Sequence, residues 1–74
     1  MMDVFAQRLK KLREEKGLSQ QALGEIIGVS KIAVYTYEKG KNYPEVRKFL
    51  ALAEFFEVSL DYLVGWSDER EIRR

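Results

Sequence analysis

The side chains with the clearest chemistry in this sequence form a short run in the middle of the chain. Lys39, Lys41 and Asn42 can each contact a phosphate oxygen, and such contacts position a protein on nucleic acid without reading its sequence. A few residues earlier, Lys31 can reach a guanine acceptor or a phosphate. Thr36 can donate a hydrogen bond to a base, accept one, or touch a thymine methyl group. Residue types of this kind suit a nucleic-acid surface, provided that the fold brings them to one face.

Catalytic and metal-binding residue types are poorly represented. The 74 residues include no histidine and no cysteine, which argues against a zinc centre, a His-based catalytic triad, a thiolate metal site and a disulfide framework. The sequence has 12 acidic residues, but no two of them form a recognisable catalytic pair, and so short a chain has little volume for a substrate pocket. We expect a protein that is not an enzyme and that uses no cofactor, metal or small-molecule effector.

Two short helices joined by a tight turn must position the cationic run. Ser19 and Ser30 suit N-caps, because a serine hydroxyl accepts a hydrogen bond from an orphan amide at a helix start. Gly28 can adopt the left-handed conformation that ends a helix. We therefore predict helices over about 20–27 and 31–38 that cross steeply, the geometry in which a helix-turn-helix enters a DNA major groove.

The outward face of the second of these helices is the expected recognition surface. Its residues are Lys31, Ile32, Tyr35 and Thr36. Ile32 and Tyr35 offer apolar contact to thymine methyl groups, which indicates readout by methyl contacts and DNA shape. The amide end beside Ser30 suits a phosphate. The alternative for the Ile-x-x-Tyr pair is a protein-binding face, since such a pair is unusual on a bare monomer surface.

Three further helices are predicted from apolar residues at helical spacing, and no segment alternates with the period of a strand. They span about residues 3–16, 45–56 and 60–64. Asp3 is the expected cap of the first, and Pro44 suits the first position of the second. The fold class is therefore all-α, a compact bundle of five short helices. The residues expected to face its core are Phe5, Leu9, Leu12, Leu23, Ile26, Ile27, Val34, Tyr37, Val46, Phe49, Leu50, Ala53 and Phe56.

Charge is divided unevenly along the chain. Residues 1–48 carry ten basic and six acidic side chains, net +4, whereas residues 49–74 carry three and six, net −3. This asymmetry suggests one face for a polyanion and another kept away from it. The length suits one domain, which we place at residues 1–66, followed by a charged tail over 67–74 with no assigned function. Because the sequence shows no signal peptide and no membrane span, we expect a soluble cytoplasmic protein.

Several short segments occur in the order and spacing of a known family. They are Arg8-Leu-Lys-Lys-Leu-Arg13, Gly17-Leu-Ser-Gln20, Gly28-Val-Ser30, Tyr37-Glu-Lys-Gly40, Pro44 and Val58-Ser-Leu-Asp-Tyr-Leu63. Together they extend from about Phe5 to Gly65. On these segments the chain resembles the lambda-repressor-like helix-turn-helix domain, also called the Cro/C1 or Xre type.

The resemblance implies a sequence-specific transcriptional regulator of double-stranded DNA, such as a phage or plasmid repressor. It implies that Gln20 meets a DNA phosphate and supports the recognition helix, and that Gly24 stands where relatives usually have alanine. Arg13 and Glu38 match a pair that joins the first helix to the end of the third; a carboxylate at a helix C-terminus also has its own reason to take a guanidinium partner. Arg8 is expected to be a solvated charge. The alternative function is a protein-interaction module, such as an antitoxin-like or anti-repressor partner with the same fold.

A homodimer is expected, because relatives of this type bind as two-fold pairs on palindromic operators with half-sites roughly 34 Å apart. Some apolar residues in the acidic half of the chain remain after the core is assigned. They form the expected dimer interface, around the fifth helix, unless they simply cap the small core: Phe55, Tyr62, Val64 and Trp66.

Overall fold

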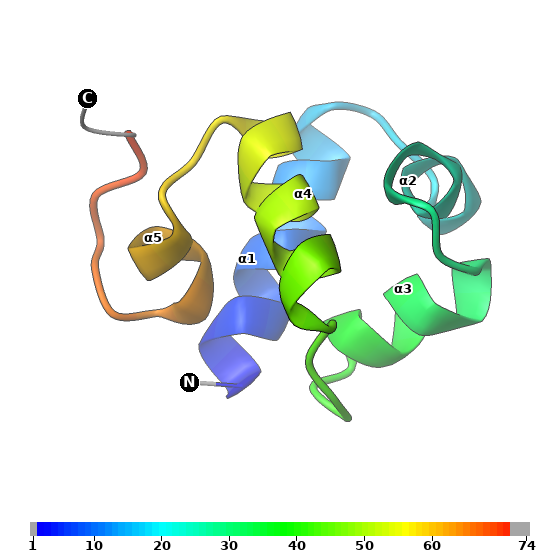
Figure 1. The fold of residues 1–74 in the computed structure, drawn as a ribbon, viewed down its shortest axis with the longest axis horizontal. Coiled ribbons are helices and arrows are strands. Elements are labelled where there is room, and N and C mark those ends of the chain that lie inside the picture. The colour runs from blue at the N-terminus through cyan, green and yellow to red at the C-terminus, as the bar shows by residue number, and fades with distance from the viewer. Residues whose placement is uncertain (1, 72–74) are drawn as a thin grey trace.

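Five helices make up the regular secondary structure of the residues that the structure describes, 2–71. In this computed structural model they are α1 (Met2–Glu15), α2 (Gln20–Ile27), α3 (Lys31–Glu38), α4 (Val46–Phe56) and α5 (Leu60–Val64). Figure 1 shows α1 and α4 crossing at the centre, with α2 and α3 on one side and α5 on the other. The predicted all-α fold of five helices is confirmed. None of the described helices combines the length and the apolar character needed to span a bilayer.

Serine caps begin three of the helices. The hydroxyl oxygens of Ser19, Ser30 and Ser59 each accept a hydrogen bond at 3.0 Å from the backbone amide three residues further on. Each bond satisfies one amide that has no partner within its helix. The predicted starts of α2, α3 and α5 are confirmed, because the cap fixes the first helical residue.

Two other predicted helix starts are wrong. Asp3 is not a cap, since the helix already includes Met2. Pro44 is not the first residue of α4, because Glu45 has extended backbone angles (φ −66°, ψ 164°) and is the N-cap of a helix that begins at Val46. Pro44 therefore precedes the cap, where its side chain is buried.

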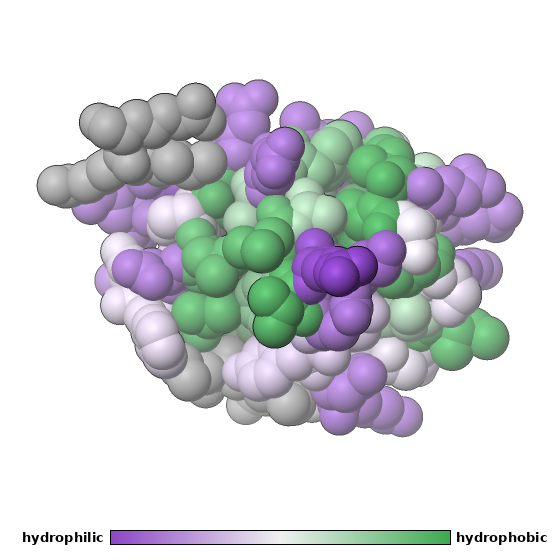
Figure 2. All heavy atoms as spheres, in the orientation of Figure 1, coloured by the Kyte–Doolittle hydropathy of each residue, from purple (hydrophilic) through white to green (hydrophobic). Residues whose placement is uncertain are grey.

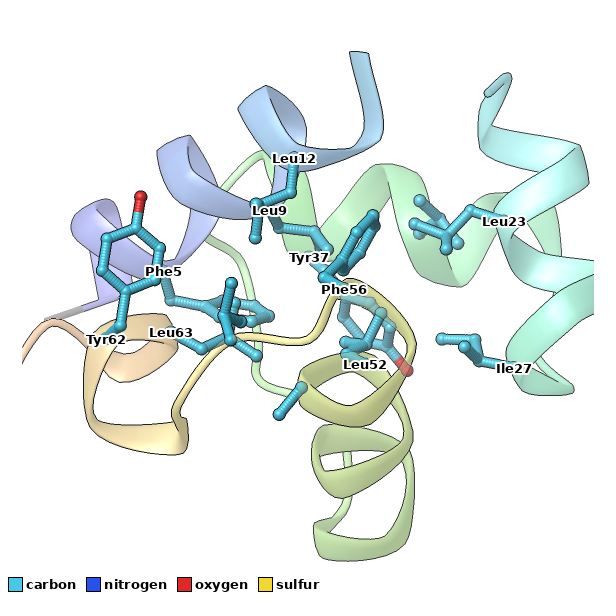
Figure 3. Packing of buried hydrophobic residues seen from close by; sticks show 13 residues of the cluster. Phe5, Leu9, Leu12, Leu23, Ile27, Tyr37, Leu52, Phe56, Tyr62 and Leu63 are labelled. Atoms are coloured by element: carbon cyan, nitrogen blue, oxygen red, sulfur yellow. The ribbon is translucent and has the colours of Figure 1, made fainter. Parts of the chain in front are cut away.

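The hydrophobic core lies where the helices meet (Figure 3). From α1, Phe5, Leu9 and Leu12 point into it at the predicted i, i+4, i+7 spacing and are buried. The other helices add buried residues that include Leu23, Ile27, Val34, Tyr37, Leu52, Phe56 and Leu63. Because the core takes one side of α3, the opposite side of that helix is left free.

Three residues that we expected in the core are exposed instead. Val46 and Leu50 of α4 are 73% and 51% exposed, and Ile26 of α2 is also exposed. On α2, Leu23 and Ile27 fill the inward positions. On α4 the residues that face the core have the spacing i, i+3, i+4, i+7, and Val46 and Leu50 lie on a neighbouring stripe of the helix. That inward set is Phe49, Leu52, Ala53 and Phe56.

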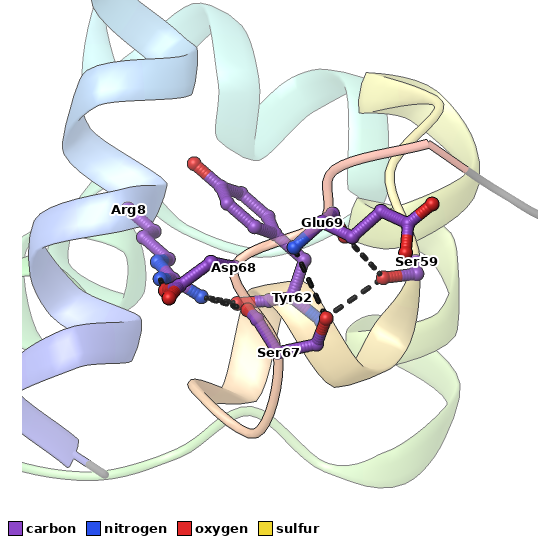
Figure 4. A network of polar contacts seen from close by, with 6 residues as sticks. All are labelled: Arg8, Ser59, Tyr62, Ser67, Asp68 and Glu69. Carbon is purple, nitrogen blue, oxygen red and sulfur yellow. Dashed lines mark hydrogen bonds and ion pairs between the residues drawn. The ribbon is translucent and has the colours of Figure 1, made fainter.

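Arg8 is not the solvated charge that we expected. Its guanidinium lies 4.1 Å from the centre of the Tyr62 ring and donates to the carbonyl oxygens of Tyr62 and, at 2.7 Å, Ser67 (Figure 4). It also pairs with Asp68 at 2.8 Å. The carbonyl of Tyr62 also accepts from the amide of Gly65 at 3.1 Å. Arg8 therefore joins the end of α5 and the residues after it to α1.

The first part of the C-terminal tail packs back on the helices. The hydroxyl of Ser59 donates to the carbonyl of Glu69 at 3.1 Å, and its amide donates to the carbonyl of Arg70 at 2.9 Å. The guanidinium of Arg70 then pairs with Glu15 of α1 at 2.8 Å. Residues 67–71 therefore join α5 to α1, while the rest of the tail that we predicted as 67–74 lies outside the described residues.

The pair between Arg70 and Glu15 should be visible in the titration of the Glu15 carboxyl. The side-chain hydrogen bond from Arg70 lowers the pKa of Glu15 below its ordinary value. We expect Arg70→Gln to raise that pKa toward the ordinary value, so that in the parent protein this link weakens only as the pH falls through the depressed pKa. NMR titration of the carboxyl carbon measures it. Identical titration curves in the two proteins would contradict the contact between Arg70 and Glu15.

Candidate nucleic-acid interface

The turn between α2 and α3 brings these helices into close contact. Gly28 has φ +81°, in the left-handed region, and its amide donates to the carbonyl of Gly24 at 2.8 Å. A Cβ on Gly24 would lie only 2.6 Å from the carbonyl oxygen of Val29. The lack of bulk at Gly24 is therefore what allows the turn to approach α2, and α3 crosses α2 with its outer side free.

The outer side of α3 carries the predicted recognition residues. Lys31, Ile32 and Tyr35 are exposed, Ile32 at 73%. On the opposite side, Val34 and Tyr37 are buried in the core. A rigid helix thus presents one cation and two apolar side chains to the surroundings.

Thr36 and Gln20 are half-buried and already have protein partners. The hydroxyl of Thr36 donates to the carbonyl of Ala33 at 2.8 Å, so its oxygen lone pairs and its methyl group are what remain for a ligand. The side-chain amide of Gln20 donates to a carboxylate oxygen of Glu38 at 3.2 Å. Gln20 therefore supports the end of α3 from α2, and its contact with a phosphate stays a prediction.

The turn after α3 places three predicted phosphate contacts at one end of the recognition helix. Lys39, Lys41 and Asn42 are all exposed. The amide of Lys41 donates to the carbonyl of Thr36 at 3.1 Å, and the ammonium of Lys39 lies 5.5 Å from the centre of the Tyr35 ring. Lys39 therefore lies against the exposed face of α3, and exposed Lys41 follows it in the turn at the end of that helix.

Tyr43 anchors this turn, and sequence reasoning gave it no such role. Its ring lies 5.4 Å from that of Phe5 and 5.9 Å from that of Phe49, centre to centre. Such ring pairs stabilise a contact beyond the area they bury. An aromatic residue directly before Pro44, inside a polar turn, was the available signal. Tyr43 fixes the base of the turn that carries Lys41.

An ion pair behind α3 connects it to α1. Nε of Arg13 lies 2.6 Å from one carboxylate oxygen of Glu38, and Nη2 lies 3.0 Å from the other. Arg13 also donates to the carbonyl of Leu18 at 2.7 Å. The side chains of Arg13 and Glu38 are only 12% and 3% exposed, and the hydrogen bond with Glu38 raises the pKa of Arg13 above its ordinary value. The predicted contact between the two residues is present in the structure, and it joins the end of α3 to α1.

Removing the serine cap of α3 should lower the free energy of unfolding by about as much as removing the serine cap of α2. We expect Ser30→Ala to lower the free energy of unfolding by about 1 kcal/mol, because the amide of Ala33 would lose its acceptor. Ser19→Ala is the matched control for the same bond to Ala22. Urea denaturation followed by circular dichroism measures both. Unchanged midpoints in both variants would contradict the caps.

The four residues predicted for a dimer interface differ in exposure. Tyr62 is buried beneath Arg8, and Phe55 and Val64 are half-buried. Trp66 is 71% exposed. Most of this set therefore contributes to the protomer itself, as in the alternative that these rings cap the core.

Comparison with known proteins gives the same fold with substantial sequence identity. The chain is 35% identical over 68 residues to the uncharacterised HTH-type transcriptional regulator YqaE of Bacillus subtilis, covering 90% of this chain and 59% of that protein. The crystal structure of the Salmonella phage P22 c2 repressor with a synthetic operator superposes with a TM-score of 0.81 at 30% identity, covering 86% of this chain and 97% of that one. The restriction-modification controller protein C.AhdI of Aeromonas hydrophila gives a TM-score of 0.74 at 32% identity, covering 84% and 94%.

A family model also matches the chain. Its description is helix-turn-helix, and the match extends over residues 9–63, which include α2, α3 and the turn after them. The chain spans about three fifths of the length of the first curated relatives that it matches. The motifs, the fold and these matches agree, and the chain belongs to the Cro/C1-type helix-turn-helix family.

Proposed function

We propose that this chain is a sequence-specific, double-stranded DNA-binding transcriptional regulator of the phage or plasmid repressor type, acting in the cytoplasm. The observation that carries the proposal is the outer side of α3, where Lys31, Ile32 and Tyr35 are exposed and which is followed by exposed lysines in the next turn. A related repressor of this fold has a structure with a synthetic operator. In the proposed complex α3 enters the major groove, and two copies occupy a palindromic site.

The proposal assigns different tasks to the two parts of the surface. Lys39, Lys41 and Asn42 contact phosphates and set the register. On α3, Ile32 and Tyr35 contact thymine methyl groups, and the methyl group and oxygen of Thr36 are available to the neighbouring base edge. The N-terminal end of α3, with Ser30 and Lys31, approaches the DNA backbone.

Selection of bound sequences from random duplex DNA tests the proposal, with affinities then measured by fluorescence anisotropy. We expect a palindrome and an affinity that falls with salt, with a slope of about −0.9 per neutralised phosphate. Lys41→Ala should weaken binding to all sequences and lower the slope by about 1, whereas Thr36→Ala should change the preferred sequence. Lys10→Ala is the matched control, since Lys10 is an exposed lysine of α1 outside the proposed interface.

A second candidate function is supported by the exposure of Ile32 and Tyr35. An Ile side chain that is 73% exposed also suits a protein surface. For an antitoxin-like or anti-repressor module we would expect no DNA shift at low salt and capture of a stoichiometric protein partner that Ile32→Lys abolishes. Binding of duplex DNA that depends on Lys41 would reject this candidate.

A further inference from the structure

An apolar stripe runs along the outer face of α4. Val46 and Leu50 are 73% and 51% exposed, and exposed Leu60 at the start of α5 lines the same surface hollow as Leu50. Figure 2 shows apolar side chains gathered on this face, over α4 and toward α5. Contiguous exposed apolar side chains on a small domain indicate a surface that a partner covers. We infer that this face is where two copies of the chain associate, with the two α4 helices antiparallel across a two-fold axis.

The stripe borders a groove that could receive a partner's side chains. A hollow of about 780 Å³ lies between α4, the start of α5 and the described part of the tail. Leu50, Ala53, Val58 and Leu60 form the apolar part of its lining, and the remaining lining residues are polar, with the carboxylates Glu54, Asp61, Glu69 and Glu71 among them. In the two-fold arrangement, Val46 and Leu50 of each copy face the groove of the other. The apolar surface of both copies is then buried in one step.

Charge complementarity identifies the occupant as a second copy. Arg47 and Glu54 are both exposed, and their spacing of i, i+7 puts them on the same side of α4, with Leu50 between them. Neither takes part in an ion pair with another described residue. The stripe therefore has a positive charge at one end and a negative charge at the other. When two copies pack antiparallel, each positive end lies opposite a negative end. Each Arg47 then meets the Glu54 of the other copy, so the contact forms twice.

The geometry fits helix packing. Residues seven apart in a helix are separated by about 10 Å along its axis, and packed helices lie about 8–10 Å apart, within the reach of an arginine side chain. The proposed face shares no residue with the outer side of α3 or with the turn after it, so both surfaces can be occupied at once. The inference rests on the proposed function only in that a palindromic site needs a pair.

Self-association without DNA is the first test, by sedimentation equilibrium of the full chain. A standard interface covers about 800 Å² per partner, and the whole surface of this protomer is 4893 Å². A patch built on three exposed apolar side chains falls at the small end of interface sizes, where association is weak, so we expect dimers to appear at concentrations on the order of 100 µM. Leu50→Lys should leave only monomers, whereas Ile32→Lys, an equally polar change at an exposed α3 position, should not alter the equilibrium.

A charge exchange tests the antiparallel pairing itself. Arg47→Glu and Glu54→Arg should each weaken the dimer by about tenfold, because each places like charges opposite one another twice. The double variant should recover most of the loss. Mixing the two single variants should give a heterodimer in preference to either homodimer, because both pairs are then complementary. Thermal melts of the single variants, which we expect to match the parent because both side chains are exposed, check folding.

Three results would overturn the inference. These are a parent chain that stays monomeric to about 500 µM, a Leu50→Lys variant that dimerises like the parent, and a mixture without preferred heterodimers. If Trp66→Lys dissociated the dimer and Leu50→Lys did not, the interface would lie at the end of α5. DNA binding that depends on Lys41 and Thr36 would persist in each case, so failure of this inference is distinguishable from failure of the proposed function.

Discussion

Arg13→Met is expected to lower the free energy of unfolding by about 3–5 kcal/mol. The side chain of Glu38 is only 3% exposed, and without the guanidinium it would keep a charge away from water with Gln20 as its remaining side-chain partner. Methionine fills much of the volume of arginine, so the loss comes from the unpaired charge and from the carbonyl of Leu18 that loses its donor, rather than from a cavity. A domain of 74 residues has a total stability of about 4–11 kcal/mol. The loss is a large fraction of that total, so the variant should melt well below the parent protein.

Two further variants separate the charge from the hydrogen bonds. Glu38→Gln removes the carboxylate charge but keeps an acceptor for Arg13, so we expect a smaller loss of about 1–2 kcal/mol. The double variant, Arg13→Met with Glu38→Gln, should be more stable than Arg13→Met alone because no charge stays buried. Urea denaturation of all four proteins gives the coupling energy. A loss below about 1 kcal/mol for Arg13→Met, the value of an exposed pair, would contradict the burial of this contact.

Phe5→Ala is expected to cost about 3–5 kcal/mol. The Phe5 ring is fully buried and lies 4.9 Å from the ring of Phe49, besides its contact with Tyr43. Its loss leaves a cavity between α1, α4 and the turn after α3. The same urea experiment measures the change, and NMR line widths of Lys41 and Asn42 should report a turn that has lost its support.

A variant that keeps a large apolar side chain at position 5 is the control for Phe5→Ala. Phe5→Leu keeps most of the apolar volume, and we expect it to cost less than about 1.5 kcal/mol. Phe49→Ala should cost less than Phe5→Ala, because Phe49 is only half-buried. Equal losses for Phe5→Leu and Phe5→Ala would show that shape at this position matters more than volume. An undisturbed turn in Phe5→Ala would show that Tyr43 does not depend on this contact.

Local chemistry was sufficient to predict the helix-turn-helix. A serine cap and a glycine in the left-handed region act within a few residues, so both ends of α2 and the start of α3 followed from Ser19, Gly28 and Ser30. The caps are confirmed, with each hydroxyl 3.0 Å from its amide. The pairing of Arg13 with Glu38 was predictable for a different reason, because it combined a family resemblance with the cost of a carboxylate at a helix C-terminus.

Long-range packing decided what the sequence left ambiguous. The apolar spacing of α4 permitted several inward faces, and the actual choice, with Leu52 inward and Leu50 outward, depends on where α1 and α5 lie. The sequence around Arg8 is typical of a solvated charge. In the structure, however, Arg8 contacts Tyr62 and Ser67, which lie more than 50 positions away in the sequence. Helical periodicity and capping hydrogen bonds depend only on residues that are close together in the sequence. Which side of a helix meets a neighbour, and which apolar stripe stays open for a second molecule, is set only when distant segments compete for the same small core.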